Sequence, residues 1–105
     1  MITIKQGDTY PPLRAYLQMV TGKAIRLNGA TVKLIVRDPL SIPKINKPVD
    51  IIDADNGYVE YRWETADTNQ YGEFRGEFEI TQQDGSIVTV PNDGYFTINI
   101  SDELG

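Results

Sequence analysis

The strongest constraint on the fold of this chain is a two-residue alternation of apolar and polar side chains within residues 57–81. The segment YVEYRW, 58–63, places a large apolar residue at every second position, and the alternation returns in EFRGEFEIT, 73–81. A period of two sends successive side chains to opposite faces of a β-strand. Both segments are therefore predicted to be strands with one buried face and one exposed face.

The same pattern recurs in shorter runs, which lie near residues 2–5, 13–19, 32–36, 88–90 and 95–100. Glycine, proline, asparagine and aspartate occupy the breaks between them, and each of these residues favours a tight turn. About seven to eight short strands separated in this way are typical of a sandwich of two sheets. Residues 1–105 are therefore predicted to form a single all-β domain, an immunoglobulin-like antiparallel β-sandwich.

A proline-rich stretch, DPLSIPKINKPV at 38–49, interrupts the pattern. It contains Pro39, Pro43 and Pro48, and proline has no N–H group to donate to a neighbouring strand. We expect an irregular loop here, flanking at most a short edge strand.

The break between the two strongest strand segments resembles the corner between strands E and F of immunoglobulin-like sandwiches. Asp67 is followed by Gly72 and by the aromatic residue Phe74, which has no hydroxyl group to tie such a corner. Trp63 is expected to anchor the core. The full predicted core consists of Leu17, Leu34, Val59, Tyr61, Trp63, Phe74, Phe78, Ile80, Phe96 and Ile98.

The charge of the chain argues against nucleic-acid binding, which relies on clustered lysine and arginine. The net charge is −5 and the isoelectric point is about 4.5. Residues 1–48 hold eight cations and two acids, a sum of +6, whereas residues 49–105 hold two cations and thirteen acids, a sum of −11. Either strands from the two halves interleave and mix these charges, or the domain is dipolar and packs positive side to negative side in an assembly.

Catalytic chemistry has little support in the sequence. The chain has no histidine and no cysteine, which excludes imidazole and thiolate nucleophiles and metal ligands. Asp53 with Asp55, or Glu77 with Glu79, supplies the two carboxylates that a glycosidase requires. The first pair is better explained as part of a turn and the second as a solvated strand face, so we expect no enzyme activity and no cofactor.

The segment DADNG, 53–57, also invites comparison with a calcium-binding loop. An EF-hand loop requires an oxygen ligand at its fifth position and glycine at its sixth, but this chain has Gly57 and Tyr58 there. A looser calcium site formed by Asp53, Asp55 and Asn56 stays open beside a plain turn. No apolar run approaches the roughly 20 residues of a membrane helix, so we expect no membrane insertion, and the first residues do not resemble a signal peptide.

Large side chains on the polar faces of the predicted strands are the best candidates for an interaction surface. Tyrosine is enriched at protein interfaces because it supplies contact area at a small entropic cost. These residues either cover the sheet and its loops or form a contact patch for a protein partner or a sugar. The candidate interface residues are Tyr10, Tyr16, Ile35, Tyr58 and Tyr95.

The order and spacing of turns and aromatic residues in the second half of the chain resemble the N-terminal domain of the phage baseplate upper protein (BppU-like) family. The earlier segments GDTYPPLRAYLQ and LNGATVKLIVRDP resemble the first strands of that family. The positions that carry the resemblance are Gly57, Tyr61, Trp63, Asp67, Thr68, Gly72, Phe74, Glu77, Phe78, Asp84, Gly85, Thr89, Pro91, Asn92, Gly94 and Tyr95.

This resemblance implies a non-catalytic module of the virion, made in the bacterial host cytoplasm. It would link tail hub proteins to receptor-binding components through protein–protein contacts, with other tail or baseplate proteins as its partners and an oligomeric arrangement in the particle. Two alternatives stay open: a carbohydrate-binding module for host cell-surface polysaccharide, and a component of the virion head or neck.

Overall fold

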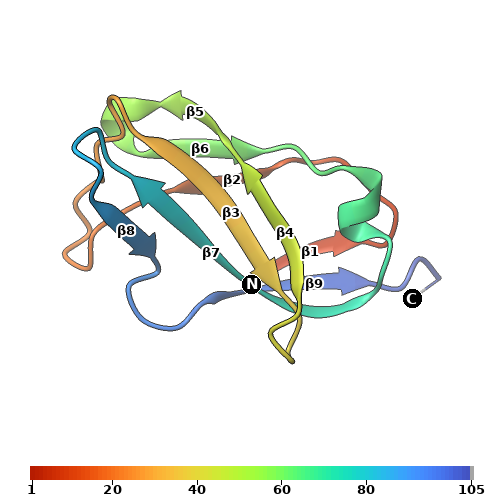
Figure 1. The fold of residues 1–105 in the computed structure, drawn as a ribbon. Helices are drawn as coiled ribbons and strands as arrows, with labels where there is room; N and C mark the ends of the chain where they lie inside the picture. The colour runs from red at the N-terminus through yellow and green to blue at the C-terminus, as the bar shows by residue number, and fades with distance from the viewer. Residues whose placement is uncertain (105) are drawn as a thin grey trace.

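The computed structural model describes residues 1–104 and arranges them in two packed β-sheets (Figure 1). The described part of the chain contains nine strands and two short 3₁₀ turns. In chain order the elements are β1 (Ile2–Lys5), β2 (Leu13–Tyr16), β3 (Thr31–Arg37), β4 (Pro43–Pro48), β5 (Asp50–Asp53), η1 (Ala54–Asn56), β6 (Tyr58–Tyr61), η2 (Thr65–Thr68), β7 (Gly72–Thr81), β8 (Ile87–Val90) and β9 (Phe96–Ser101).

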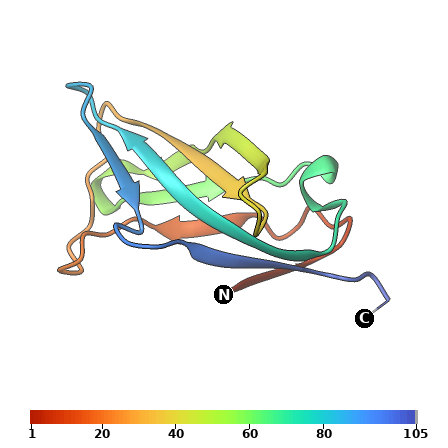
Figure 2. The ribbon, with the colours of Figure 1, turned by 60° about the horizontal axis from the view of Figure 1, so that its bottom comes forward.

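The larger sheet has six strands in the order β1-β9-β7-β3-β4, and β8 also pairs with β7. The long strand β7 holds this sheet together, because it pairs antiparallel with β3, β8 and β9. At one edge, β1 runs parallel to β9 (Figure 2). The predicted immunoglobulin-like sandwich is confirmed, but it has nine strands rather than seven or eight, and one strand pair is parallel.

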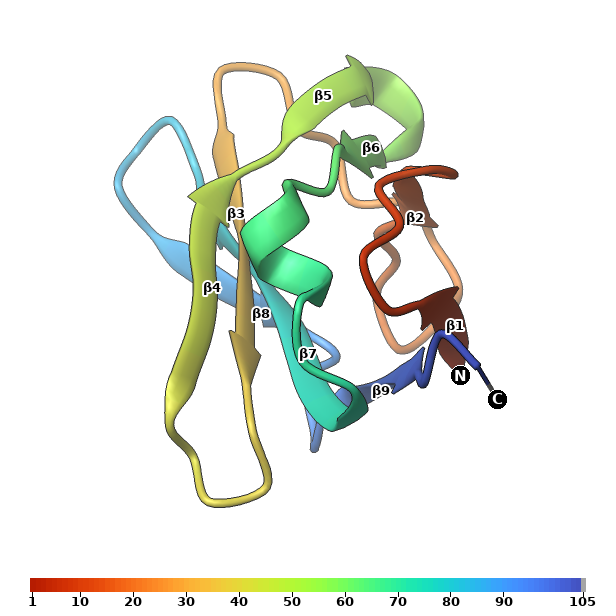
Figure 3. The same cartoon turned by 90° about the vertical axis from the view of Figure 1, so that its right-hand side faces the viewer.

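The smaller sheet contains three antiparallel strands in the order β2-β6-β5. It packs against the larger sheet, so that β3, β4 and β8 lie on one side of the domain and β2, β5 and β6 on the other (Figure 3). The segment 57–81 therefore links the two layers: β6 belongs to the smaller sheet and β7 to the larger one.

The core fills the space between the sheets with the inward residues of the alternating pattern. Nine of the ten residues assigned to it from the sequence are buried. The exception, Phe96, is half-buried and stacks on Phe78 with 5.4 Å between ring centroids. Met19, which the alternation assigns to the inner face, lies beyond the end of β2 and is half-exposed.

The proline-rich segment is more regular than its composition suggests. Residues 43–48 form β4, an edge strand that pairs with β3, so the predicted loop is confined to the turn before it. Pro43 and Pro48 lie at the two ends of β4, where a missing N–H group costs little because one side of an edge strand is unpaired.

The corner between β6 and β7 is tied by Asp67, which the sequence placed there, through a hydroxyl partner that the sequence did not identify. Asp67 lies in η2 and is buried. Its Oδ2 atom accepts hydrogen bonds from the Tyr61 hydroxyl at 2.6 Å and from the Glu64 backbone N–H at 2.8 Å. Lys47 Nζ lies 3.3 Å from Oδ1 of the same carboxylate. Tyr61 thus supplies the hydroxyl that Phe74 lacks.

Because of this environment of Tyr61, the free energy of unfolding is expected to fall at alkaline pH. Burial raises the pKa of Tyr61, and the hydrogen bond to Asp67 raises it further. Below the ordinary tyrosine pKa of about 10 the residue is neutral in both states. At higher pH the unfolded chain loses the Tyr61 proton before the folded protein does, so the free energy of unfolding falls.

Urea unfolding at pH about 8 and about 11 measures this loss of stability. The loss is expected to be smaller in Tyr61→Phe, which has no phenol proton to lose. An equal loss of stability in both proteins would contradict the assignment.

Gly76 is required by close packing against β9. A Cβ atom at this position would lie 2.6 Å from Cζ of Phe96. Gly76→Ala is therefore expected to lower the free energy of unfolding by about 1–3 kcal/mol, the usual cost of overpacking. In a Phe96→Leu background the same substitution should cost less, because the clashing ring is gone. Chemical denaturation of the four proteins tests this, and an identical cost in both backgrounds would refute the steric explanation.

The strand order mixes the charges of the two halves of the sequence. Five of the six ion pairs within residues 1–104 join a cation from residues 1–48 to an acid from residues 49–104. For example, Lys33 on β3 pairs with Glu79 on the neighbouring strand β7 at 3.6 Å. This arrangement supports interleaved charges rather than a dipolar domain.

Candidate functional site

The five candidate interface residues lie on the outer faces of two different sheets, so they do not form a single patch. Tyr16 and Tyr58 belong to β2 and β6, and Tyr10 precedes β2. Ile35 belongs to β3 of the larger sheet, and Tyr95 lies just before β9. Tyr10, Tyr16 and Tyr95 are exposed, whereas Ile35 and Tyr58 are half-buried.

The first surface is the tyrosine face, which we define as Tyr10, Arg14, Tyr16, Tyr58, Glu60 and Arg62. Tyr16 and Tyr58 are direct cross-strand partners in the register of β2 and β6. Their rings stack with 4.5 Å between centroids and an angle of 20° between planes. Tyr16 is 63% exposed, so the pair exposes an ordered aromatic surface to solvent.

Next to this pair, two arginines share one carboxylate. Arg14 Nε donates to Glu60 Oε2 at 3.1 Å, and Arg62 Nε donates to Glu60 Oε1 at 3.3 Å. The hydrogen bond from Arg14 lowers the pKa of Glu60 from its ordinary value; burial opposes this change, and the bond from Arg62 adds to it. The same contact with Glu60 raises the pKa of Arg14. Glu60 is therefore ionised at neutral pH and contacts both guanidinium groups.

A groove of about 420 Å³ runs beside these charges. Tyr10, Pro12 and Trp63 supply its apolar lining, and Arg14, Glu60 and Arg62 supply most of its polar lining. Trp63 itself is buried, and its Nε1 atom donates to the Pro11 carbonyl at 3.1 Å. The groove thus combines aromatic surface with hydrogen-bonding groups held by the small sheet.

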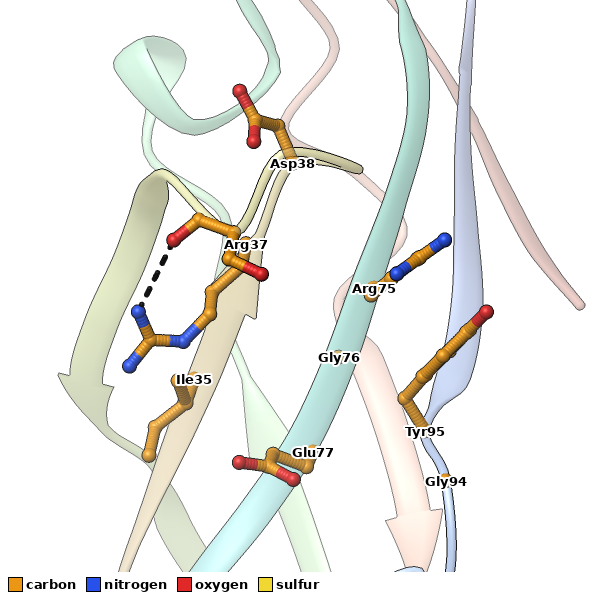
Figure 4. Close-up of a pocket in the computed structure, with 9 residues that line it drawn as sticks. Ile35, Arg37, Asp38, Arg75, Gly76, Glu77, Gly94 and Tyr95 are labelled. Carbon is orange, nitrogen blue, oxygen red and sulfur yellow. Dashed lines mark hydrogen bonds between the residues drawn. The ribbon is translucent and has the colours of Figure 1, made fainter.

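The second surface is a groove of about 170 Å³ on the larger sheet, the Ile35–Tyr95 groove (Figure 4). Ile35 lines it from β3 and Glu77 from β7, and Tyr95 lies on the side of β9. The Arg75 guanidinium lies 4.7 Å from the centroid of the Tyr95 ring, a cation–π contact that orders both side chains.

The hairpin tip between β3 and β4 lies at the edge of the same groove, which Ser41 helps to line. Asp38 Oδ1 accepts hydrogen bonds from the backbone N–H groups of Leu40 and Ile42, each at 2.9 Å. Arg37 donates to the Ser41 carbonyl at 3.3 Å (Figure 4). Leu40 is nevertheless 81% exposed and Ile42 is 57% exposed. The tip is an ordered turn that presents two aliphatic side chains to solvent.

The candidate calcium residues already make side-chain contacts, two of them with each other. Asp55 pairs with Arg26 at 3.1 Å, and Asp53 accepts a hydrogen bond from Asn56 at 2.7 Å. Within residues 1–104 no cluster of three or more acidic side chains is arranged to hold a metal ion. Over the same residues, no helix is both long and apolar enough to cross a membrane.

Several residues of both surfaces were absent from the sequence-based candidate list. Arg14, Glu60 and Arg62 lie at outward positions of the alternation, but only the β2–β6 register brings Arg14 to Glu60. Leu40 and Ile42 were hidden in the proline-rich segment. The sequence did contain an indication that these two side chains are exposed, because aliphatic residues between prolines in a turn lack a partner in the core.

The comparisons with known proteins bear on the fold alone. No protein-family model and no curated protein sequence matches this chain. Among solved structures, the crystal structure of CopC from Methylosinus trichosporium OB3b is similar, with a TM-score of 0.56 and 9% sequence identity. The match covers 96% of this chain and 83% of CopC. A likeness at this identity supports the sandwich architecture and carries no function across.

Proposed function

We propose that this chain is a non-catalytic structural module of a phage virion that belongs to the tail baseplate. It links tail hub proteins to receptor-binding components through protein–protein contacts, and it is oligomeric in the particle. The sequence resemblance to the baseplate upper protein family supports the viral setting. The observation that carries the interaction role is the ordered hairpin tip that exposes Leu40 and Ile42.

The tip supports an interaction role because exposed aliphatic side chains on a fixed turn gain stability only when a partner covers them. The adjoining Ile35–Tyr95 groove adds an aromatic anchor and charges of both signs, from Arg37, Arg75 and Glu77. Protein interfaces are commonly built from such an apolar centre with a polar rim. We therefore assign the contact with the neighbouring virion protein to the outer face of the larger sheet.

Site-specific photo-cross-linking in intact phage particles tests this assignment. A photoreactive phenylalanine analogue is placed at Leu40 in one variant and at Ile52, an exposed position of β5 in the smaller sheet, in a matched control. We expect the Leu40 variant to cross-link to a tail protein and the Ile52 variant to give little product. A head or neck protein as the main product would replace the baseplate assignment, and no product at Leu40 would refute the proposed contact face.

A further inference from the structure

The geometry of the tyrosine face points to a second binding site, and we propose that it binds a neutral oligosaccharide. This inference is independent of the protein contact assigned above, because it concerns the outer face of the other sheet. Its evidence is the arrangement of outward side chains along β2 and β6, where Arg14 lies opposite Glu60 and Tyr16 lies opposite Tyr58.

The outward residues lie in two adjacent rows, one on β2 and one on β6, and Arg62 follows directly after β6. Side chains two positions apart on a strand are about 7 Å apart, so the row from Arg62 through Glu60 to Tyr58 is about 14 Å long. Arg14 and Tyr16 form a second row beside the first on the neighbouring strand, opposite Glu60 and Tyr58, and the groove at the Arg62 end also contains Tyr10. Aromatic rings thus lie at both ends and charged hydrogen-bonding groups in the middle. A short linear ligand with several similar units fits this repeating layout.

The aromatic ends suit the apolar faces of sugar rings. Pyranose rings carry C–H groups on their faces and hydroxyl groups around their rims, so they pack on a flat aromatic surface while their rims reach polar groups. Tyr16 and Tyr10 are 63% and 65% exposed. Stacking on Tyr58 restricts the Tyr16 ring before any ligand arrives, and an ordered ring loses little entropy on binding.

The polar centre suits hydroxyl groups, which both donate and accept hydrogen bonds. Arg14 and Arg62 each contact Glu60 through Nε. Within the described residues their terminal Nη atoms make no other hydrogen bond and are free to donate. The contacts with Glu60 bring both guanidinium groups to the centre of the face, where their Nη atoms supply several donors in a planar arrangement.

The local charge selects a neutral ligand over an anionic one. Asp50 on β5 is the cross-strand partner of Glu60 and shares its outward direction. Arg14 and Arg62 are therefore balanced by Glu60 and Asp50, and the four charges sum to zero. The whole chain carries a net charge of −5. A polyanion such as a uronic-acid polymer would meet no local excess of positive charge and would be repelled by the protein as a whole.

Binding of defined oligosaccharides to the full chain tests the proposal. The probes are neutral hexasaccharides of glucose, galactose and mannose, with a galacturonic acid hexasaccharide as the charged comparison. Two-dimensional NMR of the labelled protein reports the site directly. We expect at least one neutral probe to shift the backbone signals of Arg14, Tyr16, Tyr58 and Glu60 and to leave those of Ile35 and Tyr95 unchanged.

Two variants and a matched control assign the effect to side chains. Tyr16→Ala and Arg14→Ala are each expected to weaken binding by about tenfold, the usual worth of one stacking or charge-assisted contact. Tyr95→Ala, which removes an exposed tyrosine from the other sheet, is expected to leave affinity unchanged. The absence of shifts with every neutral probe, stronger binding of the galacturonic acid probe, or an equal loss in Tyr95→Ala would each overturn the proposal. A negative result for oligosaccharide binding would not change the expected cross-link at Leu40, so the sugar site and the protein contact are tested independently.

Discussion

Replacing Trp63 with alanine is expected to lower the free energy of unfolding by about 3–5 kcal/mol, the usual cost of removing a large buried aromatic side chain. Trp63 is only 6% exposed and packs edge-on against Tyr61 with 5.5 Å between ring centroids. It also donates a hydrogen bond to the Pro11 carbonyl. The substitution would leave a cavity beside β1 and β2 together with an unpaired carbonyl group.

Urea denaturation of the purified protein measures this loss, with Trp63→Phe as the control. The control keeps much of the buried apolar area but removes the indole N–H group, so it should cost clearly less than alanine. Unfolding can be followed by far-UV circular dichroism in all three proteins, because both variants lack the only tryptophan. A loss below about 1 kcal/mol for Trp63→Ala, which is typical of surface substitutions, would show that the ring does not anchor the core.

Replacing Asp67 with alanine is the second substitution with a large expected effect. The buried carboxylate accepts hydrogen bonds from Tyr61 and from the Glu64 backbone, and it also contacts Lys47. Each buried group left without a partner costs about 1–3 kcal/mol. Two such groups, the Tyr61 hydroxyl and the Glu64 N–H, predict a total loss on the order of 3 kcal/mol or more. Thermal and urea unfolding of the variant measure it.

A double-mutant cycle with Tyr61→Phe separates the energy of the Tyr61–Asp67 hydrogen bond from that of general packing. Tyr61→Phe removes the hydroxyl group, so Asp67→Ala should cost less in that background than in the native protein. Asp67→Asn offers a milder control, because its amide oxygen can replace Oδ2 as the acceptor for both donors. Strictly additive losses in the cycle would contradict an energetic link between Tyr61 and Asp67.

The sequence predicted the sandwich and most of its core because both depend on a local pattern. Alternation in YVEYRW and EFRGEFEIT marks which side chains face inward, and the structure buries Val59, Trp63 and Phe78 accordingly. The parallel pair β1–β9 was missed because it joins the two ends of the chain, and alternation contains no information on strand partners. The strand β4 was expected at most as a short edge strand beside a loop, because its prolines were treated as breakers, although an edge position tolerates them.

The candidate surfaces were only partly predictable for a related reason. The alternation of apolar and polar residues was enough to identify Tyr16 and Tyr58 as outward residues. Their stacking, however, depends on the register between β2 and β6. The same register places Arg14 beside Glu60. Tyr95 was grouped with these residues because alternation also assigned it to an outward face, but it lies just before β9 of the other sheet. Which strands are neighbours, rather than which residues are outward, decides where a surface forms.

The most direct test of the virion role is immunogold electron microscopy of intact phage particles with antibodies raised against this chain. Disrupted particles serve as the control for epitope access. The baseplate assignment predicts gold label at the tail tip in intact particles. Label at the head or neck would contradict the baseplate, and label that is absent from both intact and disrupted particles would show that the chain is not a virion protein.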